Sequence, residues 1–129
     1  MARFNPYNQY NDVTFETANP ASLVVTTYDA AIRALKQATR AMHENDYESR
    51  VKNIDLAFSL ISELRKSLNP EKGGEIADRL NALYVFFTRE ITMANAYGDP
   101  ERLQPVIKMM KELRDAWDEA RKKSVSTEG

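Results

Sequence analysis

The sequence predicts an all-α protein, an antiparallel four-helix bundle preceded by an N-terminal aromatic extension. Four long segments repeat apolar residues in steps of three and four, which keeps one side of an α-helix apolar. Residues that favour helix starts and stops flank these segments. The connections are short, and helices of similar length joined by short loops pack best as antiparallel neighbours.

The first helix is expected at residues 20–44, because Asn19 is a favourable N-cap and Pro20 is tolerated at the first helical position. A parallel run of alanines on this helix permits close approach by a second neighbour. The residues of its inward stripe are Val24, Tyr28, Ala31, Leu35, Ala38 and Met42.

The second helix is expected at residues 45–68. It begins near Asn45-Asp46 and ends before Asn69-Pro70, because Pro disfavours a helical conformation in the residue that precedes it. The apolar side of this helix carries Tyr47, Val51, Ile54, Phe58, Ile61, Leu64 and Leu68.

A loop at residues 70–74 leads to the third helix, which is expected at residues 75–97. Apolar residues cover several faces of this helix, which indicates either a central place in the bundle or a surface that awaits a partner. One seam is formed by Ile76, Leu80, Leu83, Phe87, Ile91 and Ala94, and the other apolar residues are Tyr84, Val85, Phe86 and Met93.

The turn into the fourth helix is short, since Gly98 suits a C-cap, Asp99 an N-cap and Pro100 a first helical residue. The helix is expected to run to about Lys122, and the polar tail at 124–129 is expected to be disordered. The apolar stripe of this helix is Leu103, Val106, Met110, Leu113, Trp117 and Ala120.

Composition sets the domain organisation and the class of partner. The 129 residues are 43% hydrophobic and 29% charged, which fits one bundle at 19–123 between an extension at 1–18 and the tail. The net charge is -1, so no global field favours nucleic acid or an anionic membrane. The chain has no cysteine, no signal-peptide core and no membrane-spanning apolar run, and we expect a cytoplasmic protein.

Candidate catalytic and metal-binding residues are scarce. His43 is the only histidine and has no Glu three residues before it, so the Glu-x-x-His pair of di-iron bundles is missing. The pair Gly73-Gly74 lies outside any phosphate-binding motif. We therefore expect no enzyme activity, no cofactor and no metal. Tyr28 is interpreted as a core tyrosine with a hydrogen-bonded hydroxyl, and Trp117 as a core residue or an interface anchor.

The N-terminal extension places Phe4, Tyr7, Tyr10, Val13 and Phe15 in a stretch rich in Asn and Gln, ahead of any segment that buries them. Aromatic side chains outside a core need an apolar surface to rest on. The wide apolar surface of the third helix offers one.

Five stretches, in order along the chain, carry a family resemblance. They are Asn5-Pro6-Tyr7 with Tyr10, residues 19–23 leading to 28–32, residues 61–69, residues 73–77 with Leu83-Tyr84, and residues 113–117. Together they cover nearly the whole chain, which resembles the FliS family of flagellar secretion chaperones. The sequence departs from the common pattern at Thr26-Thr27, where the family often has Met-Leu, and at Ala30, Phe86 and Phe87.

The resemblance implies a chaperone that binds the C-terminal segment of flagellin, blocks its premature polymerisation and supports its delivery to the flagellar type III export apparatus. This segment is unstructured in the free subunit and helical in the filament. A disordered amphipathic client can order on a bundle by laying its apolar face into a groove. Other flagellar export or regulatory proteins stay open as partners. The alternative is a regulatory adaptor that binds another folded protein.

We predict that apolar residues of the second and third helices line the client groove. The extension is predicted to cover part of this groove until the client arrives, and the alternative is a tail packed permanently on the bundle. The predicted groove residues are Ile54, Phe58, Ile61, Tyr84 and Phe87, and the predicted cover residues are Phe4, Tyr7 and Tyr10.

Overall fold

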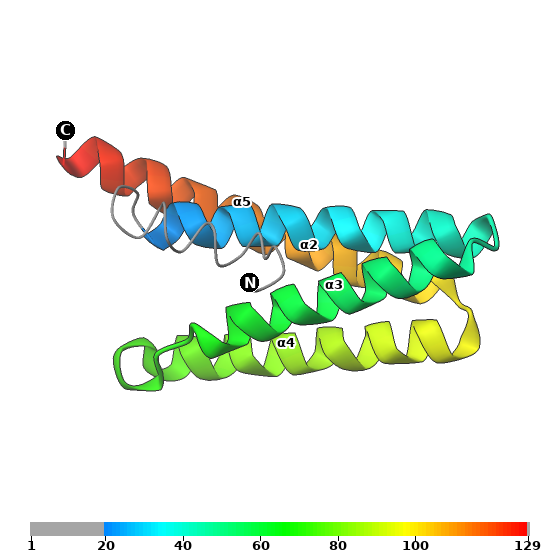
Figure 1. The fold of residues 1–129 in the computed structure, drawn as a ribbon. Helices are drawn as coiled ribbons and strands as arrows, with labels where there is room; N and C mark the ends of the chain where they lie inside the picture. The colour runs from blue at the N-terminus through cyan, green and yellow to red at the C-terminus, as the bar shows by residue number, and fades with distance from the viewer. Residues whose placement is uncertain (1–19, 129) are drawn as a thin grey trace, which may run out of the picture.

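The computed structural model describes residues 20–128, and burial of side chains is described for residues 22–123. Within this range four α-helices run in alternating directions along one long axis (Figure 1), which confirms the predicted all-α antiparallel bundle. The predicted cover residues Phe4, Tyr7 and Tyr10 lie outside the described residues. The helices are α2 (Pro20–His43), α3 (Tyr47–Lys66), α4 (Pro70–Tyr97) and α5 (Leu103–Glu128), with a 3-10 turn η1 (Pro100–Arg102) between the last two.

The connection between α3 and α4 differs from the expected loop. The Asn69 side chain accepts hydrogen bonds from the backbone N–H groups of Glu71 and Lys72, at 3.1 and 3.2 Å. Asn69 is thus an N-cap, and Pro70 stands at the start of a helical turn. Gly74 interrupts this turn with φ 51° and ψ -126°, a conformation that glycine adopts without strain. The result is a kinked start to α4 where an open loop was expected.

The connection between α4 and α5 follows the sequence signals more closely. Gly98 adopts a left-handed conformation with φ 62°, as expected of a C-cap glycine. Asp99 makes no side-chain capping bond, and Pro100 opens η1 in place of an α-helical turn. Helix α5 then continues to Glu128, past the expected end at Lys122.

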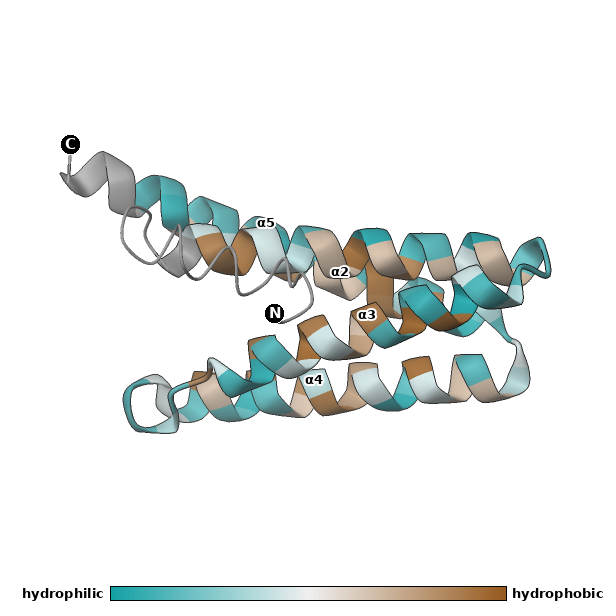
Figure 2. Ribbon diagram, viewed as in Figure 1, coloured by the Kyte–Doolittle hydropathy of each residue, from teal (hydrophilic) through white to brown (hydrophobic). Residues whose placement is uncertain are grey.

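The core lies where all four helices meet. Helix α2 packs along α3 and α5, and α4 closes the bundle from the opposite corner. In Figure 2 the hydrophobic colours gather toward the interior, and hydrophilic colours dominate the last turns of α5 that are coloured. Four alanines of α2, Ala31, Ala34, Ala38 and Ala41, are buried, which allows close approach of the neighbouring helices. The largest fully buried side chains are Tyr28, Tyr84, Phe87, Leu35, Ile54, Ile61, Ile91, Leu103, Met110 and Val106.

The two ends of the bundle differ in burial. Near the α4–η1–α5 connection, Ile91, Ala94 and Leu103 are completely buried. At the opposite end, where α2 and α4 begin, apolar side chains that pack on the core are only partly buried. These partly buried residues, which we call the open end, are Val24, Leu80, Leu83, Leu113 and Trp117.

Four residues assigned to inward stripes are exposed, and these assignments were wrong. Tyr47 and Ile76 are 73% and 69% exposed, and Val51 is also exposed. Ile76 follows the Gly74 kink, so the seam of α4 reaches the core only further along the helix. Tyr47 and Val51 occupy the first turns of α3 and turn toward the solvent beside α4. Ala120, near the end of α5, is exposed as well.

Candidate functional site

A groove runs along the surface between α3 and α4. It consists of two adjoining hollows of about 500 and 380 Å³, and both are lined by Ser62 and Arg65. We call the pair the α3/α4 groove. The first hollow is completed by Lys66, Leu68, Pro70, Ala77, Asp78 and Asn81, and the second by Phe58, Ile61, Thr88 and Thr92.

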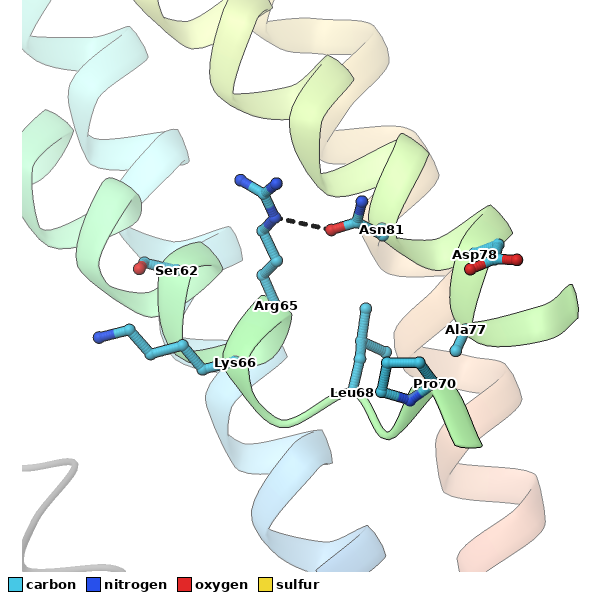
Figure 3. Close-up of a pocket in the computed structure, with 8 residues that line it drawn as sticks. All are labelled: Ser62, Arg65, Lys66, Leu68, Pro70, Ala77, Asp78 and Asn81. Atoms are coloured by element: carbon cyan, nitrogen blue, oxygen red, sulfur yellow. Dashed lines mark hydrogen bonds between the residues drawn. The ribbon is translucent and has the colours of Figure 1, made fainter. Parts of the chain in front are cut away.

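Two arginines of α3 hold the helices together across this seam. Arg65 Nε donates a hydrogen bond to Asn81 Oδ1 at 2.6 Å, as Figure 3 shows. Nearer the start of α3, Arg50 Nε donates to Asn95 Oδ1 at 2.9 Å, and Arg50 Nη2 donates to the backbone carbonyl of Asn95. These bridges fix the register of α3 against α4 and therefore the shape of the groove.

The walls of the groove are largely apolar. Phe58 is half-buried, and its ring packs on the core from the groove side. The hydroxyl groups of Thr88 and Thr92 donate to backbone carbonyls one turn earlier, at 2.9 and 2.8 Å. Because these donors are already engaged within α4, the threonines contribute little free hydrogen-bonding capacity to the wall.

The apolar surface continues beyond the two hollows. On α3, Tyr47, Val51 and Phe58 are four and seven residues apart, a spacing that places them on one helix face. On α4, Val85 is 44% exposed and lies one turn from both Asn81 and Thr88. Together with Phe58, these residues continue the apolar side chains of the groove toward the start of α3, and we call this surface the groove face.

The structure divides the five predicted groove residues into two groups. Phe58 and Ile61 line the groove, although Ile61 is only 1% exposed. Ile54, Tyr84 and Phe87 are buried in the core that all four helices share. Contact of any of these residues with a client stays a prediction.

Several residues of the groove were not predicted from the sequence. Most of them lie on the polar edge of the helix stripes, where charged and hydroxyl side chains suggested a solvated face, whereas Leu68, Pro70 and Ala77 are apolar residues that were not assigned to the groove. The spacing of Phe58, Ser62 and Arg65 at one-turn intervals was the signal that could have found them. The residues missed are Ser62, Arg65, Lys66, Leu68, Pro70, Ala77, Asp78, Asn81, Thr88 and Thr92.

Beneath the groove, two tyrosines join diagonally opposite helices. The hydroxyl oxygens of Tyr28 on α2 and Tyr84 on α4 are 2.6 Å apart in a buried hydrogen bond. This bond confirms the interpretation of Tyr28 as a core tyrosine. Burial raises the pKa of both tyrosines, and for Tyr28 the nearby Trp117 side chain acts in the opposite direction. Both hydroxyls are therefore neutral at physiological pH.

The described residues offer little for metal or membrane chemistry. His43 is exposed at the end of α2. Within residues 20–128, no three His, Asp or Glu side chains come close enough together to hold a metal ion. None of the helices in the same range combines the length and apolar character needed to cross a membrane.

Comparison with known proteins gives a consistent result. Residues 3–124 match the family model "Flagellar protein FliS". The chain is 34% identical over 108 residues to the flagellar secretion chaperone FliS of Vibrio cholerae, covering 84% of this chain and 79% of the relative. It is 30% identical over 120 residues to FliS of Bacillus subtilis, covering 93% and 89%. To FliSB of Pseudomonas aeruginosa it is 31% identical, covering 92% and 97%.

A solved structure shares the fold. A bacterial flagellar chaperone superposes with a TM-score of 0.76 at 16% identity, over 91% of this chain and 95% of the other. At that identity the likeness supports the bundle architecture and nothing finer.

Proposed function

Because the chain belongs to the FliS family of flagellar secretion chaperones, we propose that it binds the disordered C-terminal segment of flagellin in the cytoplasm. In this role it prevents premature polymerisation of flagellin and supports delivery to the flagellar type III export apparatus. The family consists of chaperones and not of enzymes, which agrees with the expectation from the sequence.

The observation that carries the proposal is the apolar groove face beside α4. From Tyr47 to Lys66, α3 presents roughly 30 Å of surface at 1.5 Å per residue, enough for several turns of a client helix. An amphipathic segment that is disordered in solution can order on such a surface by burying its apolar side. No chemical step is needed, only an apolar surface and a matching client.

Client contact is assigned first to Phe58, with Ile61 beneath it. Phe58 is half-buried, so its outer edge stays available to a partner. The groove is supported from the core by Ile54, Tyr84 and Phe87. These residues affect client binding only through the shape that they give the groove. This division narrows the sequence prediction, which gave all five residues the same role.

The extension at residues 1–18 is proposed to cover part of the client groove until the client displaces it. Its aromatic residues Phe4, Tyr7 and Tyr10 need an apolar surface, and the partly buried residues of the open end need a cover. Ordering a segment of this size costs conformational entropy comparable to what burial of its aromatics returns. A cover with such a small net gain is readily exchanged for a longer client.

Isothermal titration calorimetry with the purified C-terminal segment of flagellin tests the proposal. We expect the wild type to bind and Phe58→Ala to bind at least tenfold more weakly, since truncating a buried aromatic anchor at an interface costs about 2 kcal/mol or more. Leu56→Ala is the matched control. Leu56 is 41% exposed but lies about 200° around α3 from Phe58, so its loss should leave the affinity unchanged.

Two results would speak against this function. One is a wild-type chain that does not bind the flagellin segment. The other is capture of a folded partner in preference to that segment, which would support the regulatory adaptor.

A further inference from the structure

Arg65 lines both hollows of the α3/α4 groove and so stands between the apolar side chains of one, Phe58 and Ile61, and those of the other, Leu68, Pro70 and Ala77. Its side chain is exposed, and its guanidinium group lines both hollows. Figure 3 shows the group turned toward Asn81 on the facing helix, above Leu68 and Pro70. A partner that fills both hollows must therefore pass over this charge.

The guanidinium is held in place but not neutralised. Nε donates to Asn81 Oδ1 at 2.6 Å, a bond that orients the plane of the group. Within the described part of the chain, no carboxylate pairs with Arg65, and its two terminal nitrogens make no hydrogen bond. Two parallel N–H donors on a fixed plane match the two oxygens of a carboxylate.

The other charged side chains of the first hollow do not take the place of a partner at Arg65. Lys66 Nζ lies 3.7 Å from Glu63 Oε1, so its charge already has a partner on the same helix. Asp78 lines the far side of the first hollow, on α4. Arg65 is thus the cation of the groove that combines a fixed orientation with unused donors.

We propose that Arg65 binds an Asp or Glu side chain of the client, positioned so that apolar client residues enter the hollows on either side. This inference rests on the proposed function, because it takes the client segment as the occupant of the groove. Arg65 follows Phe58 by seven positions, which corresponds to roughly 10 Å along α3, and Leu68 lies three positions after Arg65, just past the end of the helix. The client motif is an acidic residue with one apolar residue about one turn away and another about two turns away on the opposite side.

Asn81 acts as a positioning residue in this arrangement. Its amide oxygen fixes the guanidinium without supplying a charge, and so leaves the terminal nitrogens unpaired. An aspartate at the same place would pair with Arg65 inside the protein and compete with the client.

The test is a set of binding titrations with the flagellin C-terminal segment, in which each Asp and Glu is replaced in turn by Asn or Gln. We expect one replacement to weaken binding to the wild type by about tenfold, the size of a charge-assisted hydrogen bond that the bound client covers from solvent. The same replacement should have no effect on binding to Arg65→Gln. The same replacement should likewise have no effect on binding to Asn81→Asp. This variant keeps Arg65 in place, so it separates the loss of the free terminal nitrogens from any structural effect of removing the arginine.

Lys66→Gln is the matched control, because it removes a neighbouring cation from the same hollow. With this variant the replacement should still cost about tenfold. Salt should weaken binding of the wild type more than binding of Arg65→Gln.

The outcomes separate the two proposals. A wild type that binds the segment but shows no acidic position coupled to Arg65 overturns this inference and leaves the chaperone function intact. A wild type that does not bind the segment overturns both. Sedimentation tests a further outcome. If the wild type self-associates and Arg65→Gln does not, a second copy of the chain occupies the groove, and this too would overturn the inference.

Discussion

The buried Tyr28–Tyr84 hydrogen bond allows a sharp test of how the bundle is held together. The two hydroxyl oxygens are 2.6 Å apart, and the side chains are 0% and 2% exposed. Replacing one tyrosine by Phe removes a hydroxyl and leaves the other without this partner in the interior. An unsatisfied buried hydroxyl costs about 1 to 3 kcal/mol of unfolding free energy, whereas removal of both partners is close to neutral.

The structure also predicts an asymmetry between the two single variants. After Tyr84→Phe, Trp117 remains beside the Tyr28 hydroxyl as a second polar neighbour, the one that lowers the pKa of Tyr28 against the effect of burial. After Tyr28→Phe, the Tyr84 hydroxyl has no other bond within the described residues. We therefore expect losses of about 2 kcal/mol for Tyr28→Phe and about 1 kcal/mol for Tyr84→Phe, and a change within about 0.5 kcal/mol for the double variant.

Urea unfolding followed by circular dichroism measures these differences. With an m value of about 2 kcal/mol/M, Tyr28→Phe should lower the midpoint by roughly 1 M. Tyr97→Phe is the control, since Tyr97 is 73% exposed and its change should stay within about 0.5 kcal/mol. If the two single losses of unfolding free energy add up in the double variant, the two tyrosines are not coupled and the reasoning is refuted. If the two single losses are equal, Trp117 does not compensate for the missing partner of Tyr28.

Three further predictions concern pH, the α4–α5 turn and the extension. Burial raises the pKa of both core tyrosines above the unfolded value of about 10, so the free energy of unfolding should fall as pH rises above about 10. The fall should be smaller in the double Phe variant, and an equal fall in both proteins in urea titrations at alkaline pH would contradict this. Gly98→Ala should lower the free energy of unfolding by about 1 kcal/mol, because φ is 62° at this position and a side chain there is strained. An unchanged melting temperature would contradict this. Deletion of residues 2–15 should raise client affinity in calorimetry if the extension is a cover, and unchanged or weaker binding would remove that idea.

The sequence predicted the bundle well because its signals are local. Gly98 and Pro100 mark the α4–η1–α5 connection by backbone chemistry that does not depend on the rest of the fold. Asn69-Pro70 was ambiguous for a physical reason. The same pair that stops one helix also caps the next, and only the structure shows the two roles together.

The groove was harder to predict because it depends on distances between helices. Tyr84 and Phe87 belong to an apolar surface that is continuous in sequence, and the pattern cannot separate its centre from its edge. Tyr47 and Val51 fit the inward stripe of α3 by spacing, yet they lie where α4 leaves them exposed. Arg65 looked like one more charge on a solvated face until its bond to Asn81 placed it between two hollows.

Trp117 gives the molecule a built-in optical probe. It is the single tryptophan of the chain, and it lies partly buried at the open end, against the same core that holds the tyrosine pair. Indole emission shifts toward shorter wavelengths when water is removed from around the ring. Arrival of a client or departure of the extension at this end should therefore be visible in the intrinsic fluorescence of the unlabelled protein, with time resolution sufficient to order the two events.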